Sequence, residues 1–171
     1  MKNFTILFIT AIIFFSINGV AQTDKTGKIG IGYSGALSAH TNELGMIIFA
    51  ANKISIEPTV GFRSIEFTDN SSTLWKLGLG FQYRLREFVV TPYLGLRIKD
   101  NFVTEGGETY SDLIVSAVFG GEYFVSDWFS VGAEMRFNYI KTDDDYSPTY
   151  NIAKANIYET EQVLNIRVYF N

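Results

Sequence analysis

Apolar and polar residues alternate along most of the chain, and this alternation limits the folds that the sequence can adopt. In TLWKLGLGFQYRLR, residues 73–86, nearly every second residue is large and apolar, and those between are mostly charged, polar or glycine. Successive side chains of a β-strand point to opposite faces of the sheet, so a two-residue period indicates a strand with one apolar and one polar face. Residues 88–100 repeat the pattern. The sequence therefore predicts long two-faced strands.

Eight segments carry this pattern, and the joints between them alternate in length. Those near residues 51–53, 86–87 and 126–127 are short, whereas longer and more polar joints lie at 39–42, 68–72, 101–108 and 142–159. A meander with short turns at one end and long loops at the other is typical of transmembrane barrels. We therefore expect an all-β fold, an eight-stranded antiparallel up-and-down transmembrane β-barrel. Its predicted strands are residues 28–38, 43–50, 54–67, 73–86, 88–100, 109–125, 128–141 and 160–170.

The N-terminus has the residue order of a secretory signal peptide. In MKNFTILFITAIIFFSINGVAQ, Lys2 is the only charge, an apolar run covers residues 4–15, and small residues lead to Ala21. The run is shorter than the roughly 20 residues that a membrane-spanning helix needs, which disfavours a membrane anchor. We expect residues 1–21 to be a cleaved signal peptide and residues 22–171 to be the outer-membrane β-barrel domain.

The composition argues against several classes of partner and cofactor. The chain has no cysteine and one histidine, His40, which excludes the usual Cys/His metal sites. It has 14 basic and 18 acidic residues and a net charge of −4, which argues against a nucleic-acid partner. An exported chain without disulfides must be stabilised by core packing or by closing a sheet.

The polar face combines charged residues with many glycines. Glycine weakens a strand, so a solvent-facing surface has little reason to collect it. The interior of an eight-stranded barrel is narrow and filled by side chains, so long charged residues there need small neighbours. Both signs of charge occur on this face, and buried charges must be paired to be tolerable. We expect a polar network in the lumen formed by Glu57, Arg63, Arg84, Arg97, Asp112, Glu122, Glu134, Arg136 and Arg167.

Two local features of the predicted sheet follow from the same pattern. A tight turn at residues 86–87 would place Gly80 opposite Tyr93, so that the tyrosine ring covers the glycine. Pro58 and Pro92 fall inside predicted strands, where each removes a backbone donor from the ladder. We expect a local bulge or a break in pairing at both prolines.

The segment GIGYSG, residues 30–35, has the glycine spacing of a dinucleotide-binding fingerprint. That fingerprint requires a helix directly after it and an acidic residue about 20 positions further on. Here the segment alternates as a strand, and ALSAHTNELG follows it as a loop. We therefore interpret Gly30 and Gly32 as lumen-facing spacers in the first strand.

The apolar face has the length and the ends expected of a surface in lipid. Five or six outward residues at a period of two span about 9–11 positions, the length of a tilted transmembrane strand. The alternative is a soluble periplasmic lipocalin-like barrel, whose apolar face would point inward around an apolar ligand. Aromatic residues near both strand ends favour the membrane, where they would form interfacial girdles: Phe88, Tyr123, Phe129 and Phe170 by the short turns, Trp75 and Tyr139 by the long loops.

Three stretches, VVTPYLGLR, VFGGEYFVSDWFSVGAEMRFNY and the terminal VLNIRVYF, resemble the outer-membrane β-barrel family of small porin-like and OmpA-like proteins. The resemblance implies a protein of the outer membrane of a Gram-negative bacterium, in contact with outer-membrane lipid and lipopolysaccharide. It also implies a C-terminal signal, with Val168 and Phe170, that is read by the barrel-assembly machinery. The chain departs from the family pattern by ending in Asn171 and by having Asn165 where glycine is usual.

Candidate catalytic residues are few. A lipid-modifying enzyme would need a histidine and a serine two residues apart on an outward strand, whereas His40 lies in the loop SAHTNE. Glu122 and Glu134 could form an acid/base pair, but the lumen arginines favour ion pairing instead. The consecutive aspartates at residues 143–145 could bind calcium, although such a run in a loop is more often exposed charge. We expect no enzyme, no cofactor and no metal site.

The predicted function is therefore that of a non-enzymatic integral outer-membrane protein. Such a barrel contributes to envelope structure or displays surface loops for binding, and the sequence identifies no partner for the loops. Its filled lumen leaves at most a narrow pore.

Overall fold

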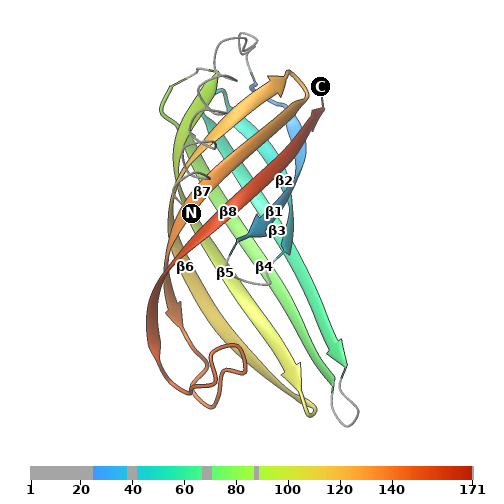
Figure 1. Cartoon of the computed structure of the whole chain (residues 1–171), viewed down its shortest axis with the longest axis vertical. Helices are drawn as coiled ribbons and strands as arrows, with labels where there is room; N and C mark the ends of the chain where they lie inside the picture. The colour runs from blue at the N-terminus through green and yellow to red at the C-terminus, as the bar shows by residue number, and fades with distance from the viewer. Residues whose placement is uncertain (1–24, 38–41, 67–70, 87–88, 171) are drawn as a thin grey trace, which may run out of the picture.

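The computed structural model describes residues 25–37, 42–66, 71–86 and 89–170, and their strands close into one barrel (Figure 1). The strands follow one another around the barrel in chain order, and β8 closes it by pairing antiparallel with β1. This confirms the predicted eight-stranded up-and-down architecture. The strands are β1 (Ile29–Ala36), β2 (Asn42–Ala51), β3 (Ile54–Glu66), β4 (Ser71–Arg84), β5 (Val90–Glu105), β6 (Glu108–Ser126), β7 (Phe129–Lys141) and β8 (Asn156–Phe170).

Several features predicted from the sequence lie outside the described residues: the signal peptide, His40, Phe88 and Asn171. The described ranges contain no helix that is long and apolar enough to cross a membrane. We call the end of the barrel that carries residues 142–155 the loop end, and the opposite end, near the C-terminus, the turn end (Figure 1).

The two-residue period of the sequence becomes the two faces of the barrel wall. Along β4, Leu77, Leu79 and Phe81 point outward and are 52%, 56% and 47% exposed, whereas Gln82 and Arg84 point inward and are buried. The same alternation of buried and exposed positions continues along the other long strands. The large apolar residues therefore cover the outside, and the charged residues fill the inside.

The connection between β5 and β6 is shorter than predicted. The sequence suggested a long loop over residues 101–108, but both strands continue to a two-residue turn at Gly106 and Gly107. Both glycines have a positive φ, 60° and 89°, which is the backbone of a type I′ hairpin turn. Polar residues are equally suited to a loop and to the end of a strand that extends beyond the apolar outer face into water. Polarity alone therefore could not distinguish a long loop from an extended hairpin.

The register between β4 and β5 also differs from the prediction. Gly80 pairs with Arg97 and not with Tyr93, because the connection runs over residues 85–89 and is longer than a two-residue turn. Tyr93 instead pairs with Gly120 on β6, where a Cβ atom would lie 2.5 Å from the tyrosine Cζ. A tyrosine ring does cover a cross-strand glycine, but on the other neighbouring strand.

The prolines disturb the sheet less than expected. The β2–β3 ladder is open at Pro58, whereas the β3–β4 ladder pairs Pro58 with Leu79 without a gap. Pro92 pairs with Gly121 without irregularity, and on its other side the β4–β5 ladder has already ended. A proline lacks one backbone N–H donor, so it interrupts the hydrogen bonds to one neighbouring strand only. Where the ladder has already ended on that side, no hydrogen bond is lost.

At the loop end, β1 and β2 extend less far than the other strands, so the barrel wall is shorter there (Figure 1). The last β2–β3 pair toward this end is Leu44 with Val60, although β3 continues to Glu66. Strands β4 to β6 extend further, and residues 142–155 fold over the same end (Figure 1).

Candidate functional site in the barrel lumen

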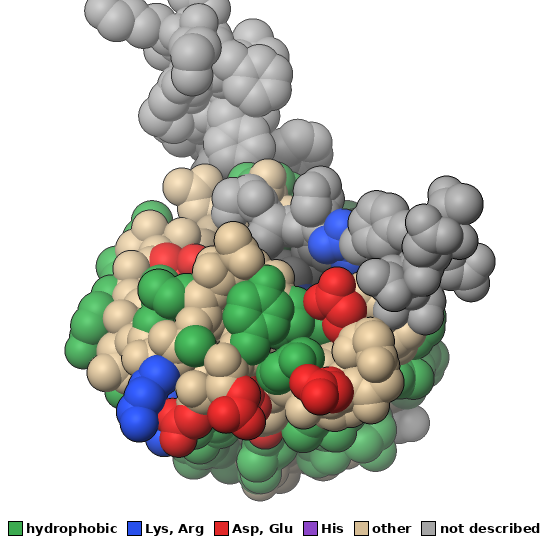
Figure 2. All heavy atoms as spheres, turned by 90° about the horizontal axis from the view of Figure 1, so that it is seen from below, with side chains coloured by type: hydrophobic (Ala, Val, Ile, Leu, Met, Phe, Trp, Pro, Cys, Tyr) green, Lys and Arg blue, Asp and Glu red, His purple; other side chains and the backbone are tan. Residues whose placement is uncertain are grey.

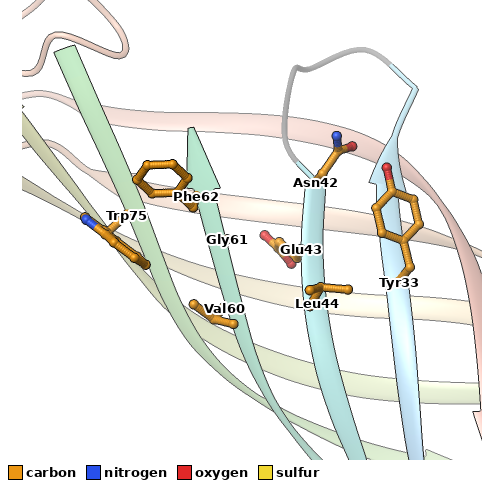
Figure 3. Close-up of a pocket in the computed structure, with 8 residues that line it drawn as sticks. All are labelled: Tyr33, Asn42, Glu43, Leu44, Val60, Gly61, Phe62 and Trp75. Carbon is orange, nitrogen blue, oxygen red and sulfur yellow. The ribbon is translucent and has the colours of Figure 1, made fainter. Parts of the chain in front are cut away.

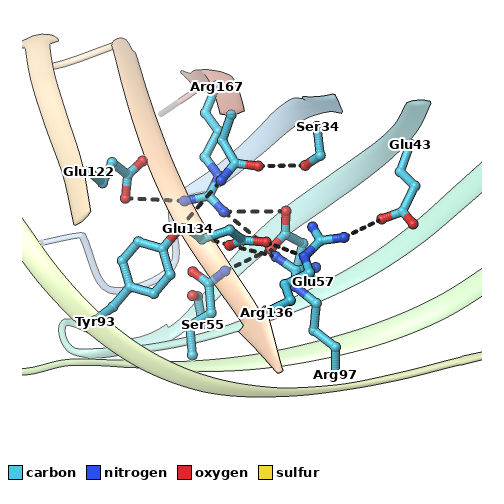
Figure 4. Close-up of polar contacts among 12 residues, drawn as sticks. Ser34, Glu43, Ser55, Glu57, Tyr93, Arg97, Glu122, Glu134, Arg136 and Arg167 are labelled. Atoms are coloured by element: carbon cyan, nitrogen blue, oxygen red, sulfur yellow. Dashed lines mark hydrogen bonds and ion pairs between the residues drawn. The ribbon is translucent and has the colours of Figure 1, made fainter. Parts of the chain in front are cut away.

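Glu57 on β3 lies at the centre of a buried network that spans the lumen (Figure 4). Its Oε2 atom lies 2.7 Å from Arg97 Nη2 and 3.3 Å from Arg167 Nη2, and Gln82 Nε2 donates to the same oxygen at 2.9 Å. These partners come from β5, β8 and β4. Barrel closure thus brings together residues that are distant in the sequence.

Glu122 on β6 continues the network toward the turn end. Its Oε2 atom lies 2.7 Å from Arg84 Nη2 and 3.4 Å from Arg167 Nη1. Its other oxygen accepts a hydrogen bond from Ser130 Oγ at 2.6 Å and one from the hydroxyl of Tyr169. Arg167 therefore links this carboxylate to the one at the centre of the lumen.

Glu134 on β7 completes this middle layer (Figure 4). Its Oε1 atom accepts from Arg136 Nε at 2.5 Å, and its Oε2 atom accepts from Tyr93 Oη at 2.9 Å. Arg97 Nη2 lies 3.5 Å from the same Oε2 atom. Each of the three buried carboxylates thus has two guanidinium partners, which offsets the cost of removing it from water.

A second charged layer lies closer to the loop end. Lys99 Nζ lies 2.9 Å from Glu43 Oε1, and Arg136 Nη1 lies 3.4 Å from Glu43 Oε2 and 3.5 Å from Glu161 Oε2. Lys76 is also buried here, and among the described residues it makes neither an ion pair nor a hydrogen bond. Arg136 pairs with Glu134 as well, so it links this layer to the middle one.

Asp112 on β6 fastens the long connection between β7 and β8 over the loop end. Its two oxygens accept from the backbone N–H of Asp143 at 3.1 Å and from Ser147 Oγ at 2.7 Å. The Asp143 carboxylate accepts from the backbone N–H groups of Asp145 and Ser111, and these hydrogen bonds lower its pKa. Asp143 is therefore used to order the loop. The described residues contain no group of three or more acidic or histidine side chains placed to hold a metal ion.

Lys25, which precedes β1, closes the lumen at the turn end. Its Nζ atom lies 2.7 Å from the ring centroid of Phe124, 5.4 Å from that of Tyr169 and 5.7 Å from that of Phe49. The backbone N–H of Gly27 donates to the carbonyl of Phe49 at 2.9 Å, and a φ of 81° at this glycine turns the chain into β1. Burial of the ammonium group lowers the pKa of Lys25 to about 7.

Most of the residues predicted for the lumen network lie together inside the barrel. Arg63 does not join them: it is exposed near the loop end, where β2 no longer walls the lumen beside β3. Val168 and Phe170, predicted as an assembly signal, lie on the outward face of β8. The predicted residues that are buried in the lumen are Glu57, Arg84, Arg97, Asp112, Glu122, Glu134, Arg136 and Arg167.

The predicted network left out five charged residues that are buried in the lumen: Lys25, Glu43, Lys76, Lys99 and Glu161. All but Lys25 lie on the polar face of strands that the sequence predicts, so applying the two-residue count to every charged residue of those strands would have found them. Lys25 lies outside any alternating segment, and no pattern in the sequence places it in the lumen.

The arrangement is the opposite of the lipocalin-like alternative. A barrel built to bind an apolar ligand would direct its apolar face inward. Here the largest fully buried side chains include four arginines, and every strand exposes large apolar residues on its outer face. The lumen is a charged interior filled by its own side chains.

Comparison with solved structures places this geometry among known folds. Neisserial surface protein A is similar, with a TM-score of 0.58 and 18% identity over 84% of this chain and 94% of that chain. The N-terminal β-barrel domain of Pseudomonas aeruginosa OprF gives a TM-score of 0.53 and 11% identity over 86% of this chain and 100% of that domain. The fold is that of a small outer-membrane β-barrel. No protein-family model and no curated protein matches the sequence, so the likeness is one of fold alone.

Proposed function

We propose that the protein is a non-enzymatic integral protein of the outer membrane, exported by a signal peptide at residues 1–21. The inverted distribution of side chains carries this proposal. On the outward face Leu96, Ile98 and Phe119 are 60%, 55% and 54% exposed, whereas arginines and glutamates are buried inside. A continuous apolar surface of this kind is unfavourable in water and favourable in a bilayer.

Aromatic pairs on the outward face support the same location. The rings of Phe62 and Trp75 lie 4.7 Å apart near the loop end. Trp128 and Phe129, 5.8 Å apart, lie at the turn end. Aromatic side chains prefer the two interfaces of a bilayer, so these pairs mark the edges of the proposed membrane belt.

The carboxylate pairing supports a non-enzymatic role. An acid/base pair needs carboxylates of different protonation state that face a substrate. Glu122 is held by Arg84 and Arg167, and Glu134 is held by Arg97 and Arg136. Both carboxylates are therefore committed to structural ion pairs.

The loop end offers the surface for a partner. Figure 2, a view onto this end, shows acidic side chains distributed around apolar ones. Tyr110 packs edge-on against Tyr146 with a centroid distance of 5.7 Å, and its hydroxyl donates to Glu108 at 2.7 Å. We propose that the barrel strengthens the envelope and presents this acidic, tyrosine-bearing surface, with lipopolysaccharide beside it.

The outward aromatic end of β8 supports a role in biogenesis. Phe170 is 49% exposed at the last described position, and Val168 lies two residues before it on the same face. We propose that this pair is the signal read by the barrel-assembly machinery.

Membrane fractionation and gel mobility test the proposal. The protein should sediment with outer membranes, resist carbonate extraction and migrate differently before and after boiling, because a closed barrel resists detergent. N-terminal sequencing of the purified protein should begin at Gln22. Release by carbonate without a mobility shift would contradict the membrane location.

A further inference from the structure

A crevice opens in the outer wall between β2 and β3, near the loop end (Figure 3). The ladder between these strands ends at Leu44 and Val60, so Asn42 and Glu43 are not paired across to β3. The crevice has a volume of about 380 Å³. It is a lateral recess in the proposed membrane face, separate from the ion pairs at the centre of the lumen.

The crevice is apolar along its outer part and polar at its inner end (Figure 3). The Phe62 and Trp75 rings form one side and lie among the aromatic residues that mark the edge of the apolar belt. Its outer wall is formed by Tyr33, Leu44, Val60, Phe62 and Trp75, with the exposed Asn42 at its rim, and its inner end by Glu43 and Gly61. A molecule that fills it would need an apolar chain and a polar head.

Lys76 on β4 lies next to the inner end, as the ladder partner of Gly61. A Cβ atom on this glycine would lie 2.9 Å from the backbone carbonyl oxygen of Asn42 and 3.3 Å from the lysine Cβ and Cδ atoms. Gly61 therefore lets the β2 backbone and the stem of the lysine approach β3 at the inner end of the crevice. The ammonium group interacts electrostatically with Glu43 and Glu161, but these carboxylates are ion-paired with Lys99 and Arg136.

The charges of the lumen layers do not cancel. Arg136 joins the loop-end layer to the middle one, and in the two layers together six cationic side chains (Lys76, Arg84, Arg97, Lys99, Arg136 and Arg167) face five carboxylates (Glu43, Glu57, Glu122, Glu134 and Glu161). Lys76 is the cation of these layers without an ion-pair partner among the described residues. An anionic head at the inner end of the crevice would balance the surplus charge. A neutral or cationic head would leave it unbalanced or increase it.

We propose that the crevice binds an anionic amphiphile from the outer leaflet, with a carboxylate or phosphate near Lys76 and an acyl chain along Leu44, Val60 and Trp75. The inference rests on the proposed membrane location, because only a bilayer delivers the acyl chain laterally to this face. The apolar wall holds the chain, and the surplus cation selects the charge of the head.

Tryptophan quenching by brominated amphiphiles tests the proposal. Trp75 lines the crevice and Trp128 lies at the turn end, so W128F leaves Trp75 as the reporter and W75F leaves the distant control. The refolded barrel, in a neutral detergent, is titrated with a dibrominated fatty acid above its pKa and with the methyl ester of the same acid. We expect half-maximal quenching of Trp75 at roughly tenfold lower concentration for the acid, the size of one charge-assisted contact. Trp128 should not distinguish the two probes.

Matched variants separate the head from the chain. In the W128F background, K76Q should remove the preference for the acid, whereas K154Q, on the loop, should retain it. V60F should block quenching by both probes, and V131F, at another outward valine, should not. If K76Q does not fold, the comparison of V60F with V131F still tests whether the crevice is the binding site, because equal quenching in the two variants would contradict it.

A comparison of two anionic probes identifies the source of the anion. A dibrominated phosphatidic acid that quenches at lower concentration than the fatty acid would assign the site to a lipid phosphate, and the reverse order to a free fatty acid. Equal quenching by acid and ester, or an unchanged preference in K76Q, would overturn the proposal. Every variant is checked for the mobility shift on boiling, so this failure is distinguishable from failure of the membrane location.

Discussion

At the scale of single residues, Lys25 combines a buried ammonium group with aromatic surroundings. Its Nζ atom faces the Phe124 ring, and no hydrogen-bond acceptor reaches it among the described residues. Desolvation lowers the pKa of Lys25 from 10.5 to about 7, against the opposing attraction of Glu122. The folded protein therefore binds fewer protons than the unfolded chain between these two values, and stability should rise with pH across that window.

The variant K25M should lose this part of the pH dependence. The free energy of unfolding of the wild type should increase from about pH 7 to about pH 10.5 relative to that of K25M, because the methionine has no proton to release. Urea unfolding of both proteins in the same detergent at several pH values measures the difference. Parallel curves for the two proteins would show that Lys25 is not desolvated in the folded barrel.

Glu57 provides a test of the buried ion pairs. E57Q removes one charge that faces both Arg97 and Arg167, and it leaves two buried guanidinium groups short of a partner. We expect a loss of about 3–5 kcal/mol in the free energy of unfolding. E108Q, at the exposed tip of the β5–β6 hairpin, is the control and should change stability by less than about 0.5 kcal/mol. Equal effects of the two variants would mean that the network contributes nothing beyond filling the lumen.

At the scale of elements, the contact between Tyr93 and Gly120 fixes β5 against β6. A Cβ atom at Gly120 would lie 2.5 Å from Tyr93 Cζ and 2.6 Å from its hydroxyl, which donates to Glu134. G120A should therefore displace the ring, weaken that hydrogen bond and cost about 1–3 kcal/mol. G121A is the matched control, because the nearest atom to a Cβ there is a Val90 methyl group at 3.4 Å. Urea unfolding that does not separate the two variants would contradict the observed register.

The β5–β6 hairpin gives a second test of an element. Its turn residues Gly106 and Gly107 both have a positive φ, which costs a non-glycine residue roughly 1–2 kcal/mol. Replacing both with alanine should increase amide hydrogen exchange at the tip of the hairpin, whereas replacing Gly106 alone with asparagine should change it little. Unchanged exchange in the double alanine variant would place the polar residues of this segment in a loop after all.

The face of each strand residue follows from the sequence, whereas the register between strands does not. Apolar alternation reports which face a residue occupies, so all eight strands and most lumen residues could be predicted from it. Alternation does not report how far one strand slides along the next. The β4–β5 register depends on the conformation of the connection at residues 85–89, and the tyrosine that should have covered Gly80 covers Gly120 instead. Arg63 has the correct face but extends past the wall formed by β2.

At the scale of the whole molecule, the lumen is closed by its own side chains. Ion pairs fill its middle, Lys25 and the aromatic cluster close the turn end, and residues 142–155 cover the loop end. We expect reconstituted liposomes to show no swelling in a neutral sugar. K25A should behave in the same way, because the central network remains in place. Steady swelling with the wild-type protein would contradict a filled lumen.

The sequence by itself determined that this protein is a barrel with an apolar outside and a charged inside, because the two-residue period of strands makes each residue's face readable from its position alone. Tertiary structure decided which charges meet. Glu57, Arg97 and Arg167 come from three strands, and their contact depends on barrel closure and on the registers of the intervening ladders. It also decided that Lys76 has no ion-pair partner among the described residues and that a crevice opens beside it, because β2 ends earlier than β3. Strand registers and the contacts between strands are set by turn geometry and packing, and the local two-residue period carries no information about either.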